Sequence, residues 1–228
     1  MLPKLPMKNI TAGLSVLINF FFPSECIGCQ REDVWLCEHC QKNIYSGHWA
    51  FPEEVLGIGK LFAMTDYHNP LVSRAIRRIK FGYCQEMLRD LDPFFKNRLQ
   101  NVVLPKNAIL VPVPLHFFRK NMRGFNQAEL FAETISKHLK RPVKNLLRRT
   151  RNTPPQTTLT GNERRKNLSE AFHVIQSEYQ GNPLILVDDV TTTHTTLQEC
   201  ASVLKKAGFS PVGAMVFAKS SENTPSLD

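Results

Sequence analysis

One stretch of sequence decides the fold, residues 184–196, which reads Leu-Ile-Leu-Val-Asp-Asp-Val-Thr-Thr-Thr-His-Thr-Thr. Its four leading apolar residues are typical of a central strand in a parallel sheet, which is buried on both faces. Asp188 and Asp189 follow at the carboxyl end of this strand, and a helix is predicted over 196–207. This order predicts a βα unit of an α/β protein, in which ligands bind at the carboxyl ends of the strands.

The loop after the two acidic residues has the composition of a phosphate-binding site, because five of the six residues 191–196 are Thr. Backbone amides and hydroxyl groups at a helix N-terminus can bind a phosphate, and the helix dipole favours negative charge there. The two carboxylates could bind ribose hydroxyls or a magnesium-bound sugar phosphate. Helix capping alone is the alternative interpretation, since Thr and Asp are good caps. The residues that we expect at the phosphate are Thr192, Thr193, His194, Thr195 and Thr196.

Strands and helices alternate on either side of this stretch, which predicts an α/β fold with a mostly parallel sheet flanked by helices. Apolar residues at helical spacing, with arginines on the other face, predict an amphipathic helix that ends near Gly82. Residues 140–168 show no sustained periodicity. Further strands are expected near 61–64 and over 108–114 and 211–218, and further helices over 85–99 and 126–139.

Four of the six cysteines form two Cys-x-x-Cys pairs that are separated by seven residues. Two such pairs present four thiolates to one tetrahedral ion, which is the geometry that zinc prefers. Two disulfides in a secreted module are the alternative, but the solitary Cys84 and Cys200 favour reduced cysteines. Four thiolates leave no open position for a catalytic water, so the predicted zinc is structural. The four expected ligands are Cys26, Cys29, Cys37 and Cys40.

These cysteines suggest two units along the chain. Residues 1–50 are expected to form an N-terminal helix and a zinc module, and residues 51–228 the α/β domain. Within the second unit we expect a polar tail at 220–228.

The N-terminal region contains an apolar stretch over 12–22 that follows Lys4 and Lys8 and resembles a short signal peptide. It is too short to span a bilayer, and no small-residue cleavage site follows it. We interpret it as a helix that packs on the protein, and we expect a cytoplasmic location with no stable transmembrane span. Peripheral contact with the inner membrane is the alternative.

The charge of the chain is unevenly distributed. Its 228 residues include 29 basic and 20 acidic side chains, a net charge of +9, and 42% apolar residues exclude a disordered chain. Residues 140–166 contain nine basic side chains and only Glu163 as an acid, a pattern typical of surfaces that bind nucleic-acid phosphates. A solvated charged loop is the alternative. The residues that we expect to bind DNA are Arg148, Arg149, Arg151, Arg164, Arg165 and Lys166.

Aromatic residues are absent from that basic segment, so base stacking would have to come from elsewhere. The nearest mixture of aromatic and basic side chains is Phe117, Phe118 and Phe125, which are flanked by Arg119 and Arg123. Core packing is the alternative role for these rings, and it is the role that we favour for Phe125.

Several motifs together resemble a known family. The 184–196 stretch is similar to the phosphoribosyl-diphosphate (PRPP) loop of type I phosphoribosyltransferases, and nearly the whole chain resembles the ComF/ComFC (GntX-like) family of competence proteins. The motifs that carry the second resemblance are the two cysteine pairs, Ile79-Lys-Phe81, Val111-Pro-Val-Pro-Leu115, Arg123-Gly-Phe-Asn-Gln-Ala128, Gln156-x-x-Leu159 and Arg164-x-x-Asn167-Leu168.

This resemblance implies a type I phosphoribosyltransferase-like domain behind a zinc module, and a role in natural transformation with incoming single-stranded DNA. Asp188 and Asp189 would take the catalytic position beside the ribose and Mg²⁺, and the Thr-rich loop would hold the 5′-phosphate of PRPP or of a nucleotide-like ligand. His194 departs from the family pattern, which has a Gly that permits a positive φ. The cations expected at the pyrophosphate are Arg119, Arg123, Arg164, Arg165 and Lys166. The basic, flexible loop of the family would fall at about 148–168.

Three functions stay open at this point. The first is a protein that binds single-stranded DNA through a phosphoribosyltransferase fold. The second is an active phosphoribosyltransferase that acts on a nucleobase or another acceptor, with DNA contact secondary. The third is an adaptor whose zinc module docks on DNA-uptake or helicase machinery. Phosphoribosyl transfer requires no protein nucleophile and none is evident, so the sequence leaves enzymatic activity undecided.

Overall fold

A computed structural model of the protein describes six segments of the chain. They are residues 24–45, 52–81, 84–151, 171–176, 178–179 and 181–220. The predicted N-terminal helix, the tail beyond Ser220 and the loop cations Arg164, Arg165 and Lys166 lie outside these segments.

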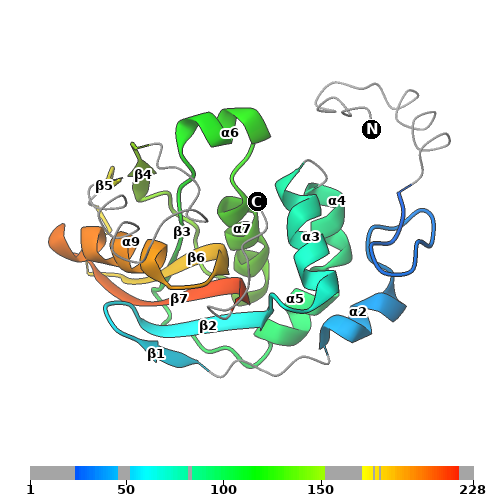
Figure 1. Ribbon diagram of the computed structural model, residues 1–228. Helices are drawn as coiled ribbons and strands as arrows, with labels where there is room; N and C mark the ends of the chain where they lie inside the picture. The colour runs from blue at the N-terminus through cyan, green and yellow to red at the C-terminus, as the bar shows by residue number, and fades with distance from the viewer. Residues whose placement is uncertain are drawn as a thin grey trace.

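The described residues contain seven strands. They are β1 (Glu53–Val55), β2 (Gly59–Asp66), β3 (Ile109–Pro112), β4 (Leu147–Arg149), β5 (Phe172–Val174), β6 (Pro183–Thr191) and β7 (Ser210–Lys219). Five form a central sheet in the order β1-β2-β7-β6-β3 (Figure 1). All neighbours in it are parallel except β1, which pairs antiparallel with β2 at one edge. Strands β4 and β5 form a separate antiparallel pair.

Helices cover both faces of the central sheet (Figure 1). They are α2 (Glu38–Tyr45), α3 (Pro70–Lys80), α4 (Cys84–Asp90), α5 (Asp92–Leu99), α6 (Phe117–Arg123), α7 (Gln127–Leu139) and α9 (Thr195–Lys206). Helices α3, α4 and α5, with most of α7, pack into one hydrophobic core, and α9 into a second one on the opposite face. This arrangement confirms the predicted α/β class with a mostly parallel sheet. Among the described helices, none is both long and apolar enough to cross a membrane.

Strand β6 joins the two cores, because successive side chains of a strand point to opposite faces. Leu184 and Leu186 belong to the core beneath α9, and Ile185 and Val187 to the core beneath α3 and α5. All four are at most 3% exposed, as expected for a central strand with both faces covered. The apolar run therefore fixes β6 in the sheet and leaves the residues after it at the carboxyl edge.

One local prediction was wrong, and one helix was not predicted. The single helix predicted over 85–99 is instead α4 and α5, interrupted at Leu91. Pro93 explains the interruption, because proline donates no backbone hydrogen bond and its ring clashes with the carbonyl of the residue four positions earlier. Helix α6 was not predicted at all; His116 caps its N-terminus through a hydrogen bond from the Phe118 amide, and Gly124 ends it at a φ of 78°.

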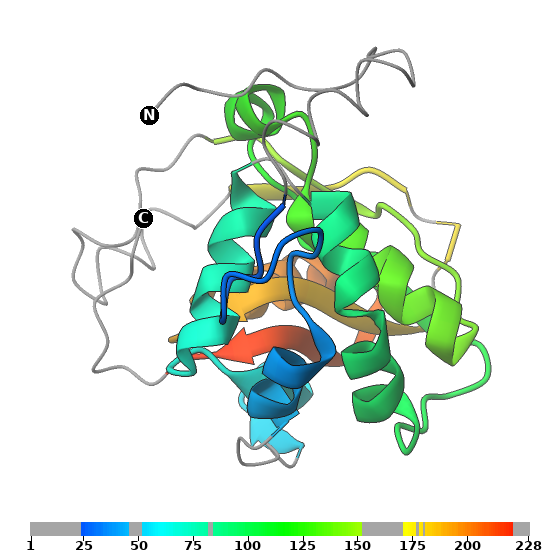
Figure 2. The same ribbon diagram turned by 90° about the vertical axis from the view of Figure 1, so that its right-hand side faces the viewer.

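The cysteine segment lies against α3 and α4 on the outside of the molecule (Figure 2). Cys26, Leu36 and Ile44 are buried in the same core as the inner face of α3. The amides of Trp35 and Leu36 both donate hydrogen bonds to the Asp90 carboxylate at the end of α4, at 2.8 and 2.9 Å. The segment is thus firmly attached to the α/β domain, and the expected boundary at residue 50 stays a prediction.

Candidate functional site

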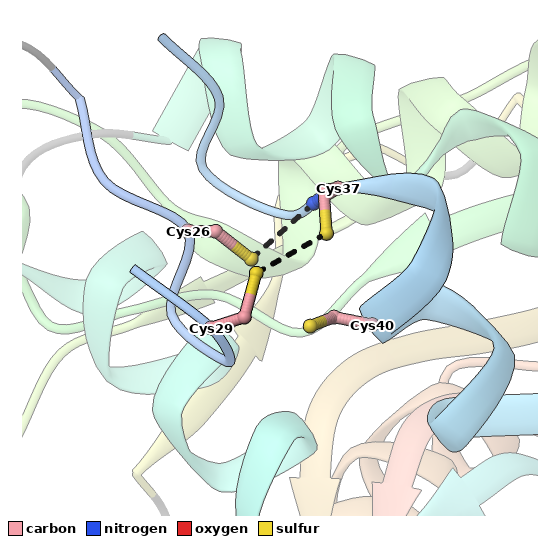
Figure 3. Close-up of side chains that lie close together, drawn as sticks. All are labelled: Cys26, Cys29, Cys37 and Cys40. Atoms are coloured by element: carbon pink, nitrogen blue, oxygen red, sulfur yellow. Dashed lines mark hydrogen bonds between the residues drawn. The ribbon is translucent and has the colours of Figure 1, made fainter. Parts of the chain in front are cut away.

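The four predicted zinc ligands come together in space (Figure 3). Their Sγ atoms all lie within 4.8 Å of one another, and no disulfide joins them. The contact between the Sγ atoms of Cys29 and Cys37 is 3.6 Å, far longer than a disulfide bond of about 2.05 Å. Four sulfur atoms converging on one point suggest a zinc site, as the two Cys-x-x-Cys pairs predicted.

Backbone geometry explains why the sulfur atoms can approach so closely. A Cβ atom on Gly28 would lie 2.5 Å from the Sγ of Cys40, so only glycine fits in this turn. Burial opposes ionisation of Cys26, but hydrogen bonds from the amides of Cys29, Cys37 and Gly28 outweigh it and lower the pKa of its thiol to about 6. Burial and the neighbouring thiols raise the pKa of Cys40 to about 12. A bound cation would be needed to ionise all four groups together.

A second candidate site lies at the carboxyl end of β6, where the predicted acidic pair is partly buried. The amide of Asp189 donates to Oδ1 of Asp188, and the amide of Val190 donates to Oδ1 of Asp189, both at 2.8 Å. Desolvation by burial, and then the charge of Asp189, raise the pKa of Asp188 well above the ordinary value of an aspartate. The pair is therefore held in place by the backbone and is costly to ionise fully.

The turn between β6 and α9 contains a residue with a positive φ, although that residue is not glycine. His194 adopts φ 60° and ψ 0°, the left-handed region, as the residue that caps α9. Its Nδ1 lies 3.0 Å from Oγ1 of Thr191, and its Nε2 lies 3.5 Å from Oε1 of Glu53. The Oγ1 atoms of Thr193 and Thr195 lie 2.8 Å apart. A turn that the resemblance associates with Gly is thus made by a His whose ring is directed at Thr191 and Glu53.

Lys80 completes this site, although the sequence reasoning assigned it no role. It ends α3, and its Nζ lies 3.3 Å from Oδ2 of Asp189. The charge of Asp189 raises the pKa of Lys80, while burial acts in the opposite direction. The only signal in the sequence was its place in the Ile79-Lys-Phe81 motif, because α3 is far from β6 along the chain.

Three arginines approach the same edge of the sheet. Arg123 of α6 acts electrostatically on Lys80 and lies with its Cζ 5.9 Å from the centre of the Phe81 ring. Burial and the charge of Arg119 lower the pKa of Arg149, whereas the charge of Asp188 raises it. Arg149, which was predicted to bind DNA, therefore lies on the side of the acidic pair, whereas its neighbour Arg148 is exposed.

The structure therefore brings together most of the residues predicted for a phosphate ligand. The Thr-rich turn, the acidic pair and Lys80 lie together at the carboxyl edge, Arg123 acts electrostatically on Lys80, and Arg149 is influenced by both Asp188 and Arg119. Arg151 lies near the end of a described segment and is exposed. Such an edge combines amide donors at a helix N-terminus with cations, and it is suited to an anionic ligand that also carries hydroxyl groups.

Comparisons with solved structures give weak likenesses. The adenine phosphoribosyltransferase of Leishmania donovani is 13% identical, with a TM-score of 0.37, and covers 82% of this chain and 85% of its own. The corresponding enzyme of Leishmania tarentolae is 14% identical, also with a TM-score of 0.37, over 81% and 88% of the two chains. Scores of this size support no argument about function.

The similarities in sequence are much stronger. No family model matches the chain. DNA utilization protein YhgH of Escherichia coli K12 is 31% identical over 201 residues, 83% of this chain and 86% of its own. Competence protein ComFC of Bacillus subtilis is 32% identical over 142 residues, 62% and 56% of the two chains. Competence protein F of Haemophilus influenzae is 32% identical over 197 residues, 80% of this chain and 85% of its own. The chain therefore belongs to the family of competence protein F, as its motifs predicted.

Proposed function

We propose that this protein acts in natural transformation or a related use of incoming DNA, where it binds single-stranded DNA in the cytoplasm. The carboxyl edge of β6 binds PRPP or a related sugar phosphate. Support for the first part comes from the family, whose members include proteins named for competence and for DNA utilization. The single observation behind the second part is the left-handed turn at His194, which leads from the acidic pair into α9.

The ligand would be bound by three groups of atoms. The amides and hydroxyls at the start of α9 would hold a phosphate, assisted by the helix dipole. The carboxylates of Asp188 and Asp189 would accept hydrogen bonds from ribose hydroxyls. Lys80, Arg119 and Arg123 would hold a second anionic group such as a pyrophosphate.

The acidic pair also fits a magnesium ion that arrives with the ligand. Mg²⁺ prefers oxygen donors and usually keeps several waters, so one or two carboxylates suffice beside the phosphate oxygens. Oδ2 of Asp189 is already paired with Lys80. In the Mg²⁺ complex, Lys80 would move from Asp189 towards the phosphate, which the ion cannot neutralise alone.

Zinc is the second cofactor that we propose, held by Cys26, Cys29, Cys37 and Cys40. The donor set fits it, since all four sulfur atoms converge and none is in a disulfide. The ion would stabilise the cysteine segment and its attachment to α3 and α4.

Phosphoribosyl transfer is a second candidate function. It is favoured by the cations that gather beside the acidic pair, because such cations stabilise the negative charge of a departing pyrophosphate.

The decisive experiment measures PRPP with Mg²⁺ and single-stranded DNA on the same preparation, separately and in competition. Isothermal titration should detect PRPP binding that is lost in the double variant Asp188→Asn, Asp189→Asn. Glu54→Gln, which removes one exposed charge from β1, is the matched control and should bind normally. Absence of PRPP binding by the unsubstituted protein would refute the phosphate site, and absence of binding to single strands would refute the DNA function.

A further inference from the structure

A groove of about 430 Å³ lies between the turn of the first cysteine pair and α3, beside the cysteine cluster, with Cys26 in its lining. One wall is formed by arginines of α3 and the other by the turn that carries the first cysteine pair. The residues that matter for its chemistry are Arg74, Arg77, Arg78, Phe81, Gln30 and Glu25. We call this surface the arginine groove.

The arginine groove is strongly cationic, since three exposed guanidinium groups face one carboxylate, that of Glu25. The opposite side of α3 is buried in the core, so the helix cannot rotate these arginines away. Nη1 of Arg74 donates a hydrogen bond of 2.9 Å to the carbonyl of Ile27, and Arg78 lies over the ring of Trp35 with its Cζ 5.1 Å from the ring centre. Two of the three arginines are therefore held along the groove.

One exposed aromatic ring, Phe81, lines the arginine groove where α3 stops, and it contacts α6, which carries two more exposed rings. Phe81 is 69% exposed and lies 5.9 Å from Cζ of Arg123, which belongs to α6. Phe117 and Phe118 on α6 are 66% and 62% exposed, and no side chain of this helix is buried. We call Phe81, Phe117 and Phe118 the aromatic tip. Core packing, the alternative considered for Phe117 and Phe118, does not describe these two rings.

We propose that single-stranded DNA binds along the arginine groove and onto the aromatic tip. The phosphates contact Arg74, Arg77 and Arg78, and unpaired bases stack on Phe117 and Phe118. This inference rests on the proposed DNA-binding function and assigns a surface to it, in addition to the predicted residues in 148–166. It also leads the strand past Lys80, next to the phosphate site.

Single-stranded DNA fits this surface better than an acidic protein or a duplex does. Guanidinium groups bind phosphates well, and a row of them on one helix follows a strand of phosphates. Aromatic rings stack on unpaired bases of any sequence, but they cannot reach bases that are stacked inside a duplex. An acidic protein would match the arginines and would leave the aromatic tip without a specific partner.

The arginine arm of the test is the salt dependence of binding to a fluorescent oligo(dT), measured by anisotropy. Each phosphate that is no longer neutralised by an arginine should reduce the log–log slope by about 0.7, so Arg74→Ala, Arg77→Ala and Arg78→Ala together should reduce it by about 2. Arg77→Ala alone keeps the hydrogen bond of Arg74 and the stack of Arg78, and should reduce the slope by about 0.7. The matched control is Lys205→Ala with Lys206→Ala, two exposed lysines at the end of α9, on the other face of the sheet.

The aromatic arm uses Phe117→Ala with Phe118→Ala. Removal of base stacking should lower the affinity for oligo(dT) at least fivefold without changing the salt slope, and should leave duplex binding unchanged. Val103→Ala, another exposed apolar side chain, is the control and should bind as the unsubstituted protein does. Zinc content and thermal unfolding verify that every variant is folded.

The outcomes separate this inference from the function on which it rests. If the unsubstituted protein binds oligo(dT) and both sets of variants bind it equally well, the DNA lies elsewhere and the arginine groove serves a protein partner. If the unsubstituted protein does not bind oligo(dT), both the inference and the DNA-binding function fail.

Discussion

The cysteine cluster and the carboxyl edge of β6 are assembled in opposite ways. All four sulfur atoms come from residues 26–40, a single short segment with two tight turns. The edge of β6 takes its residues from β6, α9, α3, α6 and β4. Spacing alone is enough to predict the first site, whereas the second exists only after the sheet has formed.

The two sites also differ in how their charge is balanced. The cysteine cluster contains four groups of the same kind, and the pKa of Cys40 is raised to about 12 by burial and by its thiol neighbours. The β6 edge contains its own cation, since Lys80 pairs with Asp189. Removing a metal should therefore damage the first site far more than the second.

The largest effect is expected from Cys40→Ser. The variant should lose about one equivalent of zinc and at least about 3 kcal/mol of free energy of unfolding, because metal binding and folding of such a segment are coupled. The destabilisation should extend to the α/β domain, since Cys40 shares a core with α3. Elemental analysis and urea denaturation measure the two quantities.

Cys200→Ala is the control for that variant. Cys200 is fully buried in α9 and lies outside the cysteine cluster, so its removal should leave the zinc content unchanged. A Cys40→Ser protein with full zinc and normal stability would contradict the assignment of the cluster as a structural zinc site.

The next effect is expected from Lys80→Met. Without the lysine, the carboxylate of Asp189 stays beside Asp188 in a partly buried position, which should cost about 2 kcal/mol of free energy of unfolding. Because the pKa of Lys80 is raised, the stability that its pair with Asp189 contributes is complete at neutral pH. It is lost only as the pH rises above the ordinary pKa of a lysine.

A double-mutant cycle tests whether the pair is responsible. Adding Asp189→Asn to Lys80→Met removes the carboxylate that was left unpaired, so the double variant should regain most of the missing stability. Additive effects in urea denaturation would mean that Lys80 stabilises the protein through packing and not through Asp189.

Lys80 also illustrates what the sequence could and could not predict. The apolar run before Asp188 was sufficient for a central strand, whereas His194, which departs from the Gly of the family pattern, nevertheless has a φ of 60°. The contact between Lys80 and Asp189 depends on the length and packing of α3, and no local pattern contains that information. The break between α4 and α5 was visible as Pro93, a signal that outweighs helical periodicity.

Helix α6 was missed for a related reason. Its seven residues bury no side chain, so they show none of the apolar periodicity from which helices are predicted. Its caps at His116 and Gly124 are local signals, but caps without an apolar face are weak indications of a helix. The sequence could indicate that Phe117 and Phe118 lie among cations, and only the structure exposes their rings.

A smaller effect, of opposite sign, is expected from Asp188→Asn. The pKa of the Asp188 carboxyl is raised in the folded protein. In the unfolded chain this pKa is about 3.9, so the native state loses stability as the pH rises from that value towards the folded pKa. Asparagine keeps an Oδ1 acceptor for the amide of Asp189 and avoids this cost. We expect a gain of about 1 kcal/mol at pH 7, or about 2–4 °C in Tm, together with weaker PRPP binding.

Thermal unfolding at two pH values tests the sign of that effect. The gain should be present at pH 7 and should vanish below about pH 4, where the carboxyl group is protonated in both the folded and the unfolded protein. A loss of stability at pH 7 that vanishes on acidification would show that Asp188 is ionised and favourably paired in the native state, contrary to the proposed cause.

The smallest effect is expected at His194, where the two sites can be compared directly. Gly28 in the cysteine turn tolerates no side chain at all, whereas the turn before α9 accepts a His at φ 60°. His194→Gly relieves the left-handed strain but removes the hydrogen bond with Thr191 and adds freedom to the unfolded chain, so stability should change by no more than about 0.5 kcal/mol. His194→Ala removes the hydrogen bond and keeps the strain, and should cost about 1 kcal/mol.

If the backbone of this turn binds the phosphate, both variants should retain PRPP affinity within about threefold, less than about 1 kcal/mol. A tenfold weaker affinity in both would make the imidazole itself a ligand of the phosphate.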